Sequence, residues 1–256
     1  MIRGLYTSAL GMTTQMNKMD VVANNIANMD TTGFKKDKVV TRSFTEELMK
    51  RLGDQSDILR TVPVGGMSMG LFVDDIYTDF RNGSLRSTGA PLNLAIVGEG
   101  FFVIMAENAN GVMEEKYSRD GSFTLDAGRV LMTKLGQRVM GLNGEIMIPD
   151  GEIAINSNGE IYSDDEYIDT LRLQSFSDLH SLRKYKDNLY NITEQSQPIP
   201  FAGIIEQGFV ENSNANSVNE MLDMITTARL YDANQRMITA HDTILQRVSN
   251  DIGRKQ

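Results

Sequence analysis

The chain has 256 residues, of which 41% are hydrophobic and 23% charged, values that are typical of a folded globular protein and exclude wholesale disorder. Its formal net charge of −9 opposes binding to nucleic acid or to an anionic membrane surface. With no cysteine and two histidines, disulfides, thiolate catalysis and cysteine-ligated metals are excluded, and we expect no cofactor and no metal ion. No apolar run reaches the roughly 18 residues of a membrane-spanning helix, so we expect no direct membrane insertion.

The N-terminal segment carries an apolar pattern with the period of a helix. Starting at Ile2, apolar residues recur at alternating steps of three and four, which predicts an amphipathic helix with a heptad stripe. Gly4 and Gly11 each weaken this helix by about 1 kcal/mol, so it should need a partner helix. After Ile2, the stripe consists of Leu5, Ala9, Met12, Met16, Met19, Ala23 and Ile26.

A short linker is predicted to follow. Ser43-Phe44-Thr45-Glu46 has the form of a capping box, and it predicts a helix from Ser43 to Leu52. Residues 53–70 are rich in glycine and polar side chains, which predicts an extended or hinge segment.

The composition changes between about residues 61 and 210. Of the 22 glycines, 17 lie here, together with six Asn-Gly or Asp-Gly pairs of the kind that forms tight turns. Short apolar runs such as 92–97 and 101–105 flank these turns and predict an antiparallel β-domain. This segment carries 11 basic and 21 acidic side chains, so almost all of the chain's negative charge belongs to it.

The C-terminal segment predicts a second long helix. Ser217 to Glu220 form a capping box at its start, and a stripe with a spacing of seven follows, formed by Met224, Tyr231, Ile238, Leu245 and Ile252. This helix could be the partner of the first one, or both helices could simply cover one face of the protein's own core.

The predicted fold class is α+β, mainly β by domain. Residues 1–60 form an N-terminal helical domain with its linker helix, residues 61–210 the central antiparallel β-domain, and residues 211–256 the C-terminal helix. The two terminal helices are expected to pair in a coiled-coil-like domain.

The best candidates for catalysis are the consecutive carboxylates Asp164, Asp165 and Glu166, since two carboxylates can act as general acid and base. They leave open a β-rich cell-wall hydrolase, although such runs are more often a solvated edge of a sheet. The loop 156–160 is too short for a calcium-binding EF-hand, and Gly98-Glu99-Gly100 precedes a strand instead of the helix that a phosphate site needs. We therefore predict a protein without enzymatic activity.

Four blocks of the sequence stand out as motifs. The first is the run 5–12 leading into 23–35, and the others are 77–102, 117–129 and 207–214 ahead of the C-terminal helix. Together they resemble the bacterial flagellar axial proteins, in particular the two-domain, distal-rod-like proteins of the basal-body rod. The resemblance identifies a signature turn formed by Asn24, Asn25, Asn28, Thr31, Thr32, Gly33 and Phe34.

This turn also has a physical interpretation. Gly33 can adopt a positive φ, and the Asn and Thr side chains can satisfy backbone groups at a helix end. An ordinary helix terminator would show the same features.

The resemblance implies a structural subunit that assembles with copies of itself into a helical tube in the flagellar basal body. The terminal helices would line the tube, with the two stripes as self-assembly seams, and the β-domain would form its outer layer. The tube would act as a driveshaft that transmits torque from motor to hook, in contact with neighbouring rod and hook proteins. A hook or hook-associated subunit is the alternative.

The resemblance further implies passage through the flagellar type III export apparatus without cleavage. In agreement, Tyr6, Thr7 and Ser8 interrupt the first apolar stretch and no small-x-small cleavage site follows. We expect no cleaved signal peptide.

Overall fold

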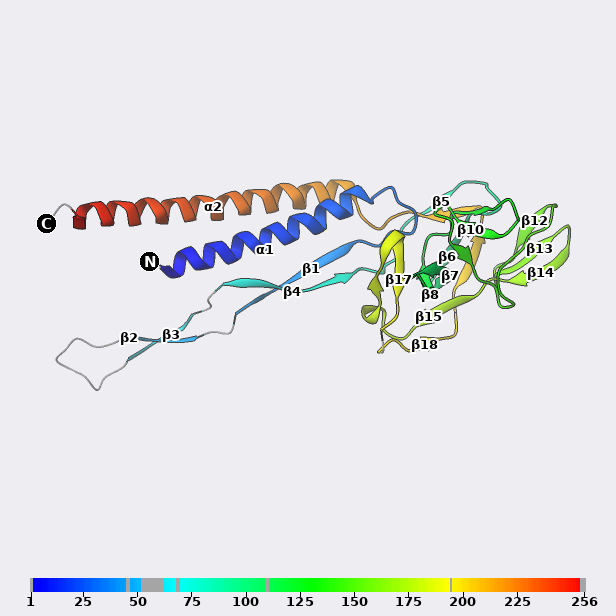
Figure 1. The fold of residues 1–256 in the computed structure, drawn as a ribbon, viewed down its shortest axis with the longest axis horizontal. Helices are drawn as coiled ribbons and strands as arrows, with labels where there is room; N and C mark the ends of the chain where they lie inside the picture. The colour runs from blue at the N-terminus through cyan, green and yellow to red at the C-terminus, as the bar shows by residue number, and fades with distance from the viewer. Residues whose placement is uncertain are drawn as a thin grey trace. The chain divides into compact units, whose positions relative to one another are not determined.

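The computed structural model describes residues 2–44, 47–51, 62–67, 70–108, 111–193 and 195–253 (Figure 1). The chain divides into two compact units. The helical unit comprises Met1–Ile26, Asp37–Tyr77 and Ser217–Gln256, and the β-unit comprises Ala27–Lys36 and Thr78–Asn216. The chain thus passes between the units four times.

Two long helices and two strand pairs make up the described part of the helical unit. The predicted terminal helices are confirmed as α1 (Ile2–Ala27) and α2 (Ser217–Gly253). Neither helix, over its described residues, is long and apolar enough to cross a membrane. The strands are β1 (Asp37–Ser43), β2 (Glu47–Arg51), β3 (Val62–Met67) and β4 (Leu71–Thr78), with β1 paired to β4 and β2 antiparallel to β3.

The prediction of a helix from Ser43 to Leu52 is wrong. Ser43 ends β1, and residues 47–51 form β2, whose ladder with β3 runs from Glu47 opposite Met67 to Arg51 opposite Val62. Interstrand hydrogen bonding therefore overrides a run of residues with good helix propensity. Thr45, Glu46 and Leu52, and residues 53–61 and 68–69 of the predicted hinge, lie outside the described residues.

The two helices run antiparallel in one fixed register. A Cβ built on Gly4 would lie 2.7 Å from Nε2 of His241, and one built on Gly11 would lie 3.1 Å from the side-chain amide of Asn234. Near the other end, Asn25 Nδ2 donates to Glu220 Oε2 at 3.2 Å. Along each helix, successive contacts are separated by seven and then fourteen residues, which is the spacing of a heptad seam.

The β-unit is built on antiparallel strands, as predicted. Its largest sheet has the order β16-β17-β8-β7-β11-β10-β9, and β15 joins β7 to β18. The bounds are β7 (Phe101–Glu107), β8 (Met113–Ser118), β9 (Phe123–Leu125), β10 (Leu131–Thr133), β11 (Arg138–Val139), β15 (Leu173–Phe176), β16 (Arg183–Lys184), β17 (Leu189–Asn191) and β18 (Pro198–Ile199).

Smaller sheets complete the unit. They are β12-β13-β14, β6-β19 and β5-β20, with the bounds β5 (Leu85–Ser87), β6 (Leu94–Val97), β12 (Ile153–Ile155), β13 (Glu160–Ser163), β14 (Glu166–Thr170), β19 (Ile204–Gln207) and β20 (Phe209–Glu211). Two 3₁₀ turns, Leu179–Ser181 and Lys186–Asn188, lie near β16 and β17.

Two apolar clusters form the core of the β-unit. The larger contains Phe102, Ile104 and Leu131 together with residues of β6, β13 and β19. The smaller is aromatic, with Phe101 packed against Phe80 and Tyr190 at ring-centroid distances of 5.6 Å each. The β-unit therefore has an apolar core of its own.

The unit boundaries differ from the domain boundaries expected at residues 61 and 210. Residues 62–77 belong with the helices because β3 and β4 pair with β2 and β1. Residues 27–36 belong with the β-unit, and the contacts that hold them there form the candidate site described next.

Candidate functional site: the junction of three connecting segments

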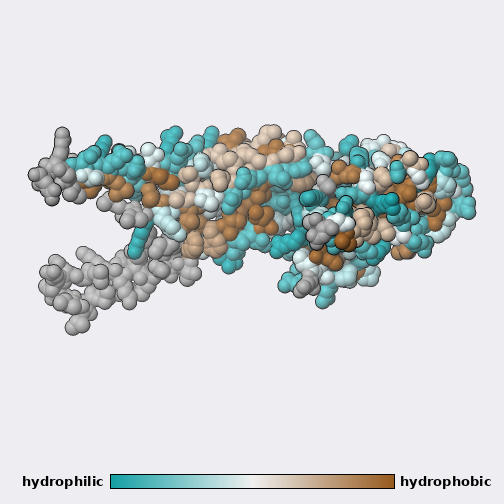
Figure 2. Space-filling model, viewed as in Figure 1, coloured by the Kyte–Doolittle hydropathy of each residue, from teal (hydrophilic) through white to brown (hydrophobic). Residues whose placement is uncertain are grey.

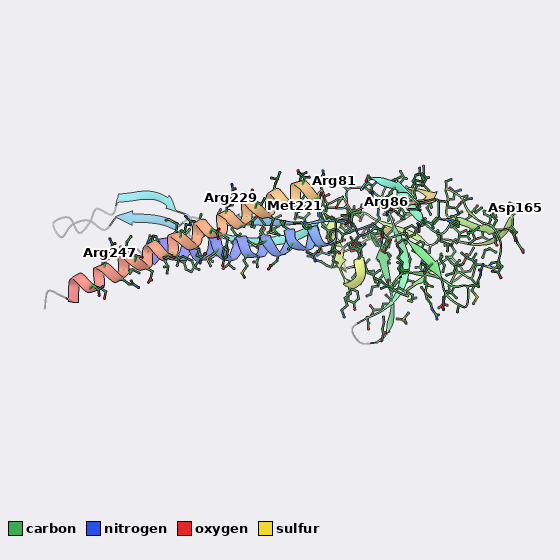
Figure 3. The ribbon with its side chains drawn as sticks, turned by 90° about the horizontal axis from the view of Figure 1, so that it is seen from above. Arg81, Arg86, Asp165, Met221, Arg229 and Arg247 are labelled. Atoms are coloured by element: carbon green, nitrogen blue, oxygen red, sulfur yellow. The ribbon has the colours of Figure 1, made fainter. Side chains whose placement is uncertain are left out.

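The carboxylates considered for catalysis do not form a site. Asp164 and Asp165 have φ values of 50° and 68° and make the tight turn between β13 and β14, and Glu166 begins β14. Asp164 Oδ1 accepts from the backbone N–H of Glu152 at 2.9 Å, and Asp165 lies at the tip of this hairpin (Figure 3). Among the described residues, no group of three or more His, Asp or Glu side chains could hold a metal ion.

The stripe predicted on α1 does not face α2. Gly4, Gly11 and Asn25 face α2, and the stripe residues that directly follow them along the helix point about 100° away. Ala9, Met16 and Ala23 are exposed, with Met16 at 50% of its full exposure, whereas Leu5, Met12, Met19 and Ile26 are half-buried.

Another side of α1 contacts β4 and the glycine that precedes it. Thr14 Oγ1 donates to the carbonyl of Leu71 at 3.2 Å, and a Cβ on Gly70 would lie 3.0 Å from Leu10. Two sides of α1 are thus contacted within the chain, and of the predicted stripe Ala9, Met16 and Ala23 remain exposed.

The stripe of α2 is divided between the seam and solvent. Met224, Tyr231 and Ile238 are half-buried on the side that faces α1, Leu245 is exposed, and the side chain of Ile252 lies outside the described residues. Three further apolar residues, Leu230, Met237 and Ile244, are also exposed. Figure 2 shows apolar side chains gathered on the visible surface of the helices.

The signature turn spans the boundary between the units. In the helical unit, Asn25 is buried, its Oδ1 accepts from the N–H of Asp37 at 3.0 Å, and its Nδ2 donates to the Asp37 carbonyl at 2.9 Å. Asn24 is exposed, and the Asn28 carbonyl accepts from the N–H of Thr31 at 3.2 Å. The turn from Asn28 to Thr31 ends the helix, as the simpler interpretation predicts.

The second half of the turn docks into the β-unit. Gly33 has a φ of 65°, which confirms the predicted positive φ, and a Cβ there would collide with the backbone of Arg119. Thr32 Oγ1 donates to Asp120 Oδ1 at 2.6 Å. Phe34 is buried, and the ammonium of Lys184 lies 4.1 Å from its ring centroid, a distance at which a cation is attracted to the ring face.

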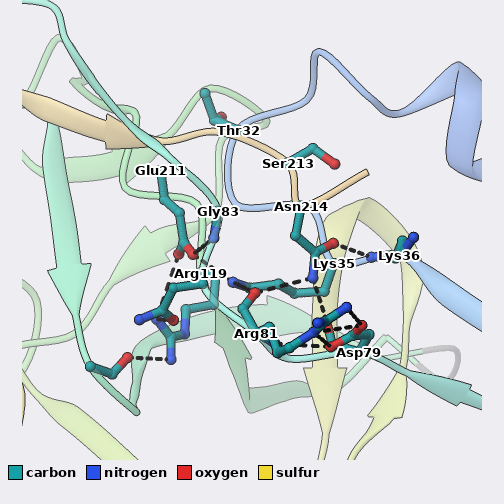
Figure 4. Close-up of polar contacts among 12 residues, drawn as sticks. Thr32, Lys35, Lys36, Asp79, Arg81, Gly83, Arg119, Glu211, Ser213 and Asn214 are labelled. Atoms are coloured by element: carbon teal, nitrogen blue, oxygen red, sulfur yellow. Dashed lines mark hydrogen bonds and ion pairs between the residues drawn. The ribbon is translucent and has the colours of Figure 1, made fainter. Parts of the chain in front are cut away.

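Three chain segments meet at this point, which we call the junction (Figure 4). Segment 31–36 follows α1, segment 79–83 follows β4, and segment 211–214 leads to α2. Backbone hydrogen bonds connect them, from the N–H of Gly33 to the carbonyl of Glu211 (2.8 Å) and from the N–H of Asp79 to the carbonyl of Lys36 (2.9 Å).

A buried ion cluster forms the centre of the junction. Lys35 Nζ lies 2.5 Å from Glu211 Oε1, and Arg119 Nη1 lies 3.5 Å from Glu211 Oε2. All three side chains are at most 1% exposed. Lys35 Nζ also donates to the carbonyl of Arg81 at 2.9 Å, and Glu211 Oε1 accepts from the N–H of Gly83 at 2.8 Å. The cluster therefore binds all three segments to one another.

Two cations share one carboxylate in this cluster. Burial lowers the pKa of Lys35, and the nearby Arg119 charge lowers it further, while Glu211 opposes the shift. Arg119 is additionally held by the carbonyl of Gly98 at 2.8 Å and by the Phe101 ring, 5.2 Å from its guanidinium carbon. Glu211 thus supplies the negative charge that compensates both Lys35 and Arg119 in this cluster.

Asn214 makes a second set of contacts among the same segments. Its Oδ1 accepts from the N–H of Lys36 at 2.8 Å, and its Nδ2 donates to the carbonyls of Asp79 and Arg81 at 2.6 and 3.1 Å. Like Lys35, this one side chain joins all three segments.

Sequence reasoning missed Lys35, Arg119, Glu211 and Asn214 as functional residues, although all four lie in the motif blocks. Their partners are up to 178 positions apart, so no periodic pattern connects them. The sequence signal that could have pointed to Lys35 is the run 33–35, in which the lysine directly follows a glycine and a phenylalanine.

Three family models match the chain. They are described as flagella basal body rod protein, matching residues 5–35, flagellar hook protein FlgE/F/G D1 domain, matching residues 95–163, and flagellar basal body rod FlgEFG protein C-terminal, matching residues 206–251. Lys35 lies in the first matched region and Glu211 in the last.

Similar proteins align with nearly the whole chain. This chain is 32% identical to the flagellar basal-body rod protein FlgG of Buchnera aphidicola subsp. Schizaphis graminum, and the alignment covers 97% of this chain and 99% of the relative. It is 30% identical to FlgG of Bacillus subtilis, covering 98% and 99%, and 30% identical to the rod protein FlgF of Caulobacter vibrioides, covering 93% of each.

Proposed function

Because the chain belongs to the flagellar basal-body rod protein family, it is a structural subunit of the rod and not an enzyme, and we propose that it self-assembles through the uncovered sides of its terminal helices. The similar chains named above are rod proteins, so a hook or hook-associated subunit is not favoured. In the proposed assembly, copies of the chain form a helical tube and contact neighbouring rod and hook proteins.

The observation that carries this proposal is the exposed part of the α1 stripe. Its other two sides are covered by α2 and by β4, yet Ala9, Met16 and Ala23 remain in water. Burying apolar surface contributes about 25 cal/mol per Å², so covering this stripe with helices of other copies would stabilise a tube. Leu230, Met237 and Ile244 on α2 would add to the same contacts.

Charge supports the same arrangement. Residues 61–210 have 11 basic and 21 acidic side chains, whereas the two ends of the chain together are nearly neutral. Helices with little net charge can pack closely without long-range repulsion, while an acidic β-unit is best placed in the solvated outer layer. Such a tube would transmit torque from motor to hook.

We also propose export through the flagellar type III apparatus without cleavage. A chain that crosses such an apparatus unfolded cannot form incorrect disulfides if it has no cysteine, and this chain has none.

Charged substitutions on the stripe test the proposal. Met16→Asp and Leu245→Asp change exposed side chains, so each purified variant should keep the helical content of the wild type. In the tube each would bury an unpaired carboxylate, so we expect isolated basal bodies to lack complete rods in electron micrographs, and the cells to be non-motile.

Thr239→Asp is the matched control. It adds the same charge to an exposed position of α2 that lies outside the stripe, and it should leave rods and swimming intact. Complete rods in both stripe variants would refute self-assembly through these surfaces.

A further inference from the structure

We propose that the buried Lys35–Arg119–Glu211 cluster is the mechanical coupling through which load passes between the β-unit and the chain segments that lead to the helices. This inference rests on the proposed role in torque transmission. It assigns to Lys35 and Glu211 a positioning role: they hold the three connecting segments in a fixed arrangement at the point where these segments enter the β-unit.

The course of the chain shows why load would concentrate there. Within one subunit, covalent connections between the units occur after residues 26, 36, 77 and 216. Lys35 and Lys36 directly precede the second connection, Asp79 follows the third by two residues, and Asn214 precedes the fourth by three. A force carried along the chain through these three connections therefore passes through residues of the junction.

The contacts at the junction suit resistance to shear. Apolar contacts are non-directional, so they fix the position of one segment along another less strictly than hydrogen bonds do. Hydrogen bonds and ion pairs weaken steeply when their geometry is distorted. Separating Lys35 from Glu211 would also leave buried charges without compensation, so relative movement of segments 31–36 and 211–214 is strongly opposed.

Two independent side chains join the same three segments. Lys35 reaches Arg81 and Glu211 from the first segment, and Asn214 reaches Lys36 and Asp79 from the third. If segment 31–36 only had to be buried in the β-unit, Gly33 and Phe34 would be sufficient, and the polar contacts would not be needed. The polar contacts in addition fix the position of each segment along the others.

Lys35→Met is the informative variant. Methionine keeps an unbranched side chain of similar length, and Arg119 and Glu211 remain as a balanced pair, so we expect the β-unit to fold. Lys116→Met is the matched control, because Lys116 is also a buried lysine of the β-unit and pairs with Glu114 at 2.8 Å, but lies in β8 away from the connecting segments.

The first measurement is amide hydrogen exchange of the full-length purified chain. In Lys35→Met, the N–H groups of Gly33, Asp79 and Asn214, which bond across the junction, should exchange about tenfold faster or more, while those of Phe102 and Ile104 in the core should not change. In Lys116→Met, none of these amides should change. Unchanged exchange at the junction, or equal acceleration throughout the β-unit, would overturn the proposal.

The second measurement is swimming at increasing viscosity. Lys35→Met cells should assemble complete rods and swim in dilute medium, but lose swimming at high viscosity, where the load on the rod is greatest. Swimming equal to that of Lys116→Met cells at every viscosity, or the absence of rods, would refute mechanical coupling. Failure of the proposed function would instead show as complete rods in the Met16→Asp and Leu245→Asp strains, so the two outcomes are distinguishable.

Discussion

The helical unit and the β-unit differ in how far their large apolar residues form a core within the unit. In the β-unit, Phe101, Phe102 and Ile104 are fully buried by residues of the same unit. In the helical unit, the seam between α1 and α2 contains glycine, asparagine and histidine, while Met16 and Met237 are about half exposed. The β-unit thus has an apolar core of its own, although Leu135 and Leu142 are exposed on its surface, whereas the exposed apolar residues of the helices would be buried against other chains.

This difference predicts unequal responses to truncation of large apolar side chains. Phe102→Ala opens a cavity beside Phe123, whose ring lies 5.0 Å away between centroids, and should lower the free energy of unfolding by about 3–5 kcal/mol. Met16→Ala removes an exposed side chain and should change it by less than about 0.5 kcal/mol in the isolated chain. Urea unfolding followed by circular dichroism measures both, and similar losses would remove the contrast between the units.

The second comparison concerns charge in the β-unit. Glu211→Gln leaves Lys35 and Arg119 buried with no opposing charge in their cluster, and removing one partner of a buried pair costs about 3–5 kcal/mol. Glu115→Gln breaks a pair with Arg172 that is about 40% exposed, and it should cost about 1 kcal/mol or less. Equal midpoints of urea unfolding for the two variants would contradict the central role of Glu211.

The smallest effect is expected in the helical seam. Gly11→Leu places a large side chain against Asn234 and should separate the helices locally, at a cost of about 1–3 kcal/mol that is offset by about 1 kcal/mol of helix propensity. Ala9→Leu makes a similar change on the exposed side and should be neutral in the isolated chain. Faster hydrogen exchange of α1 and α2 amides in Gly11→Leu alone would support the register, and equal exchange in both variants would contradict it.

Local patterns in the sequence were sufficient for several parts of the fold. Steps of three and four between apolar residues predicted α1, and a capping box followed by a stripe with a spacing of seven predicted α2. Frequent Asn-Gly and Asp-Gly pairs between short apolar runs predicted the antiparallel β-unit. The positive φ of Gly33 was also predictable, because few other residues adopt it without strain.

Other parts depended on contacts between distant residues. The segment 47–51 has helix-forming residues but pairs with β3 as a strand, and a preference of a few tenths of a kcal/mol per residue is readily overridden by such pairing. The two glycines of α1 looked like weak points, but Gly4 and Gly11 are the positions where α2 approaches most closely. The partners of Lys35 lie 46 and 176 residues away in the sequence.

The sequence by itself determined the class of fold, the two amphipathic helices and the family to which the chain belongs, because these depend on periodicity, turn chemistry and local motifs. Only the tertiary structure decided which side of each helix remains uncovered, and that segments 31–36, 79–83 and 211–214 meet around one buried carboxylate. Those features arise from packing between residues far apart in the chain. Packing selects one arrangement among several that the same local preferences allow.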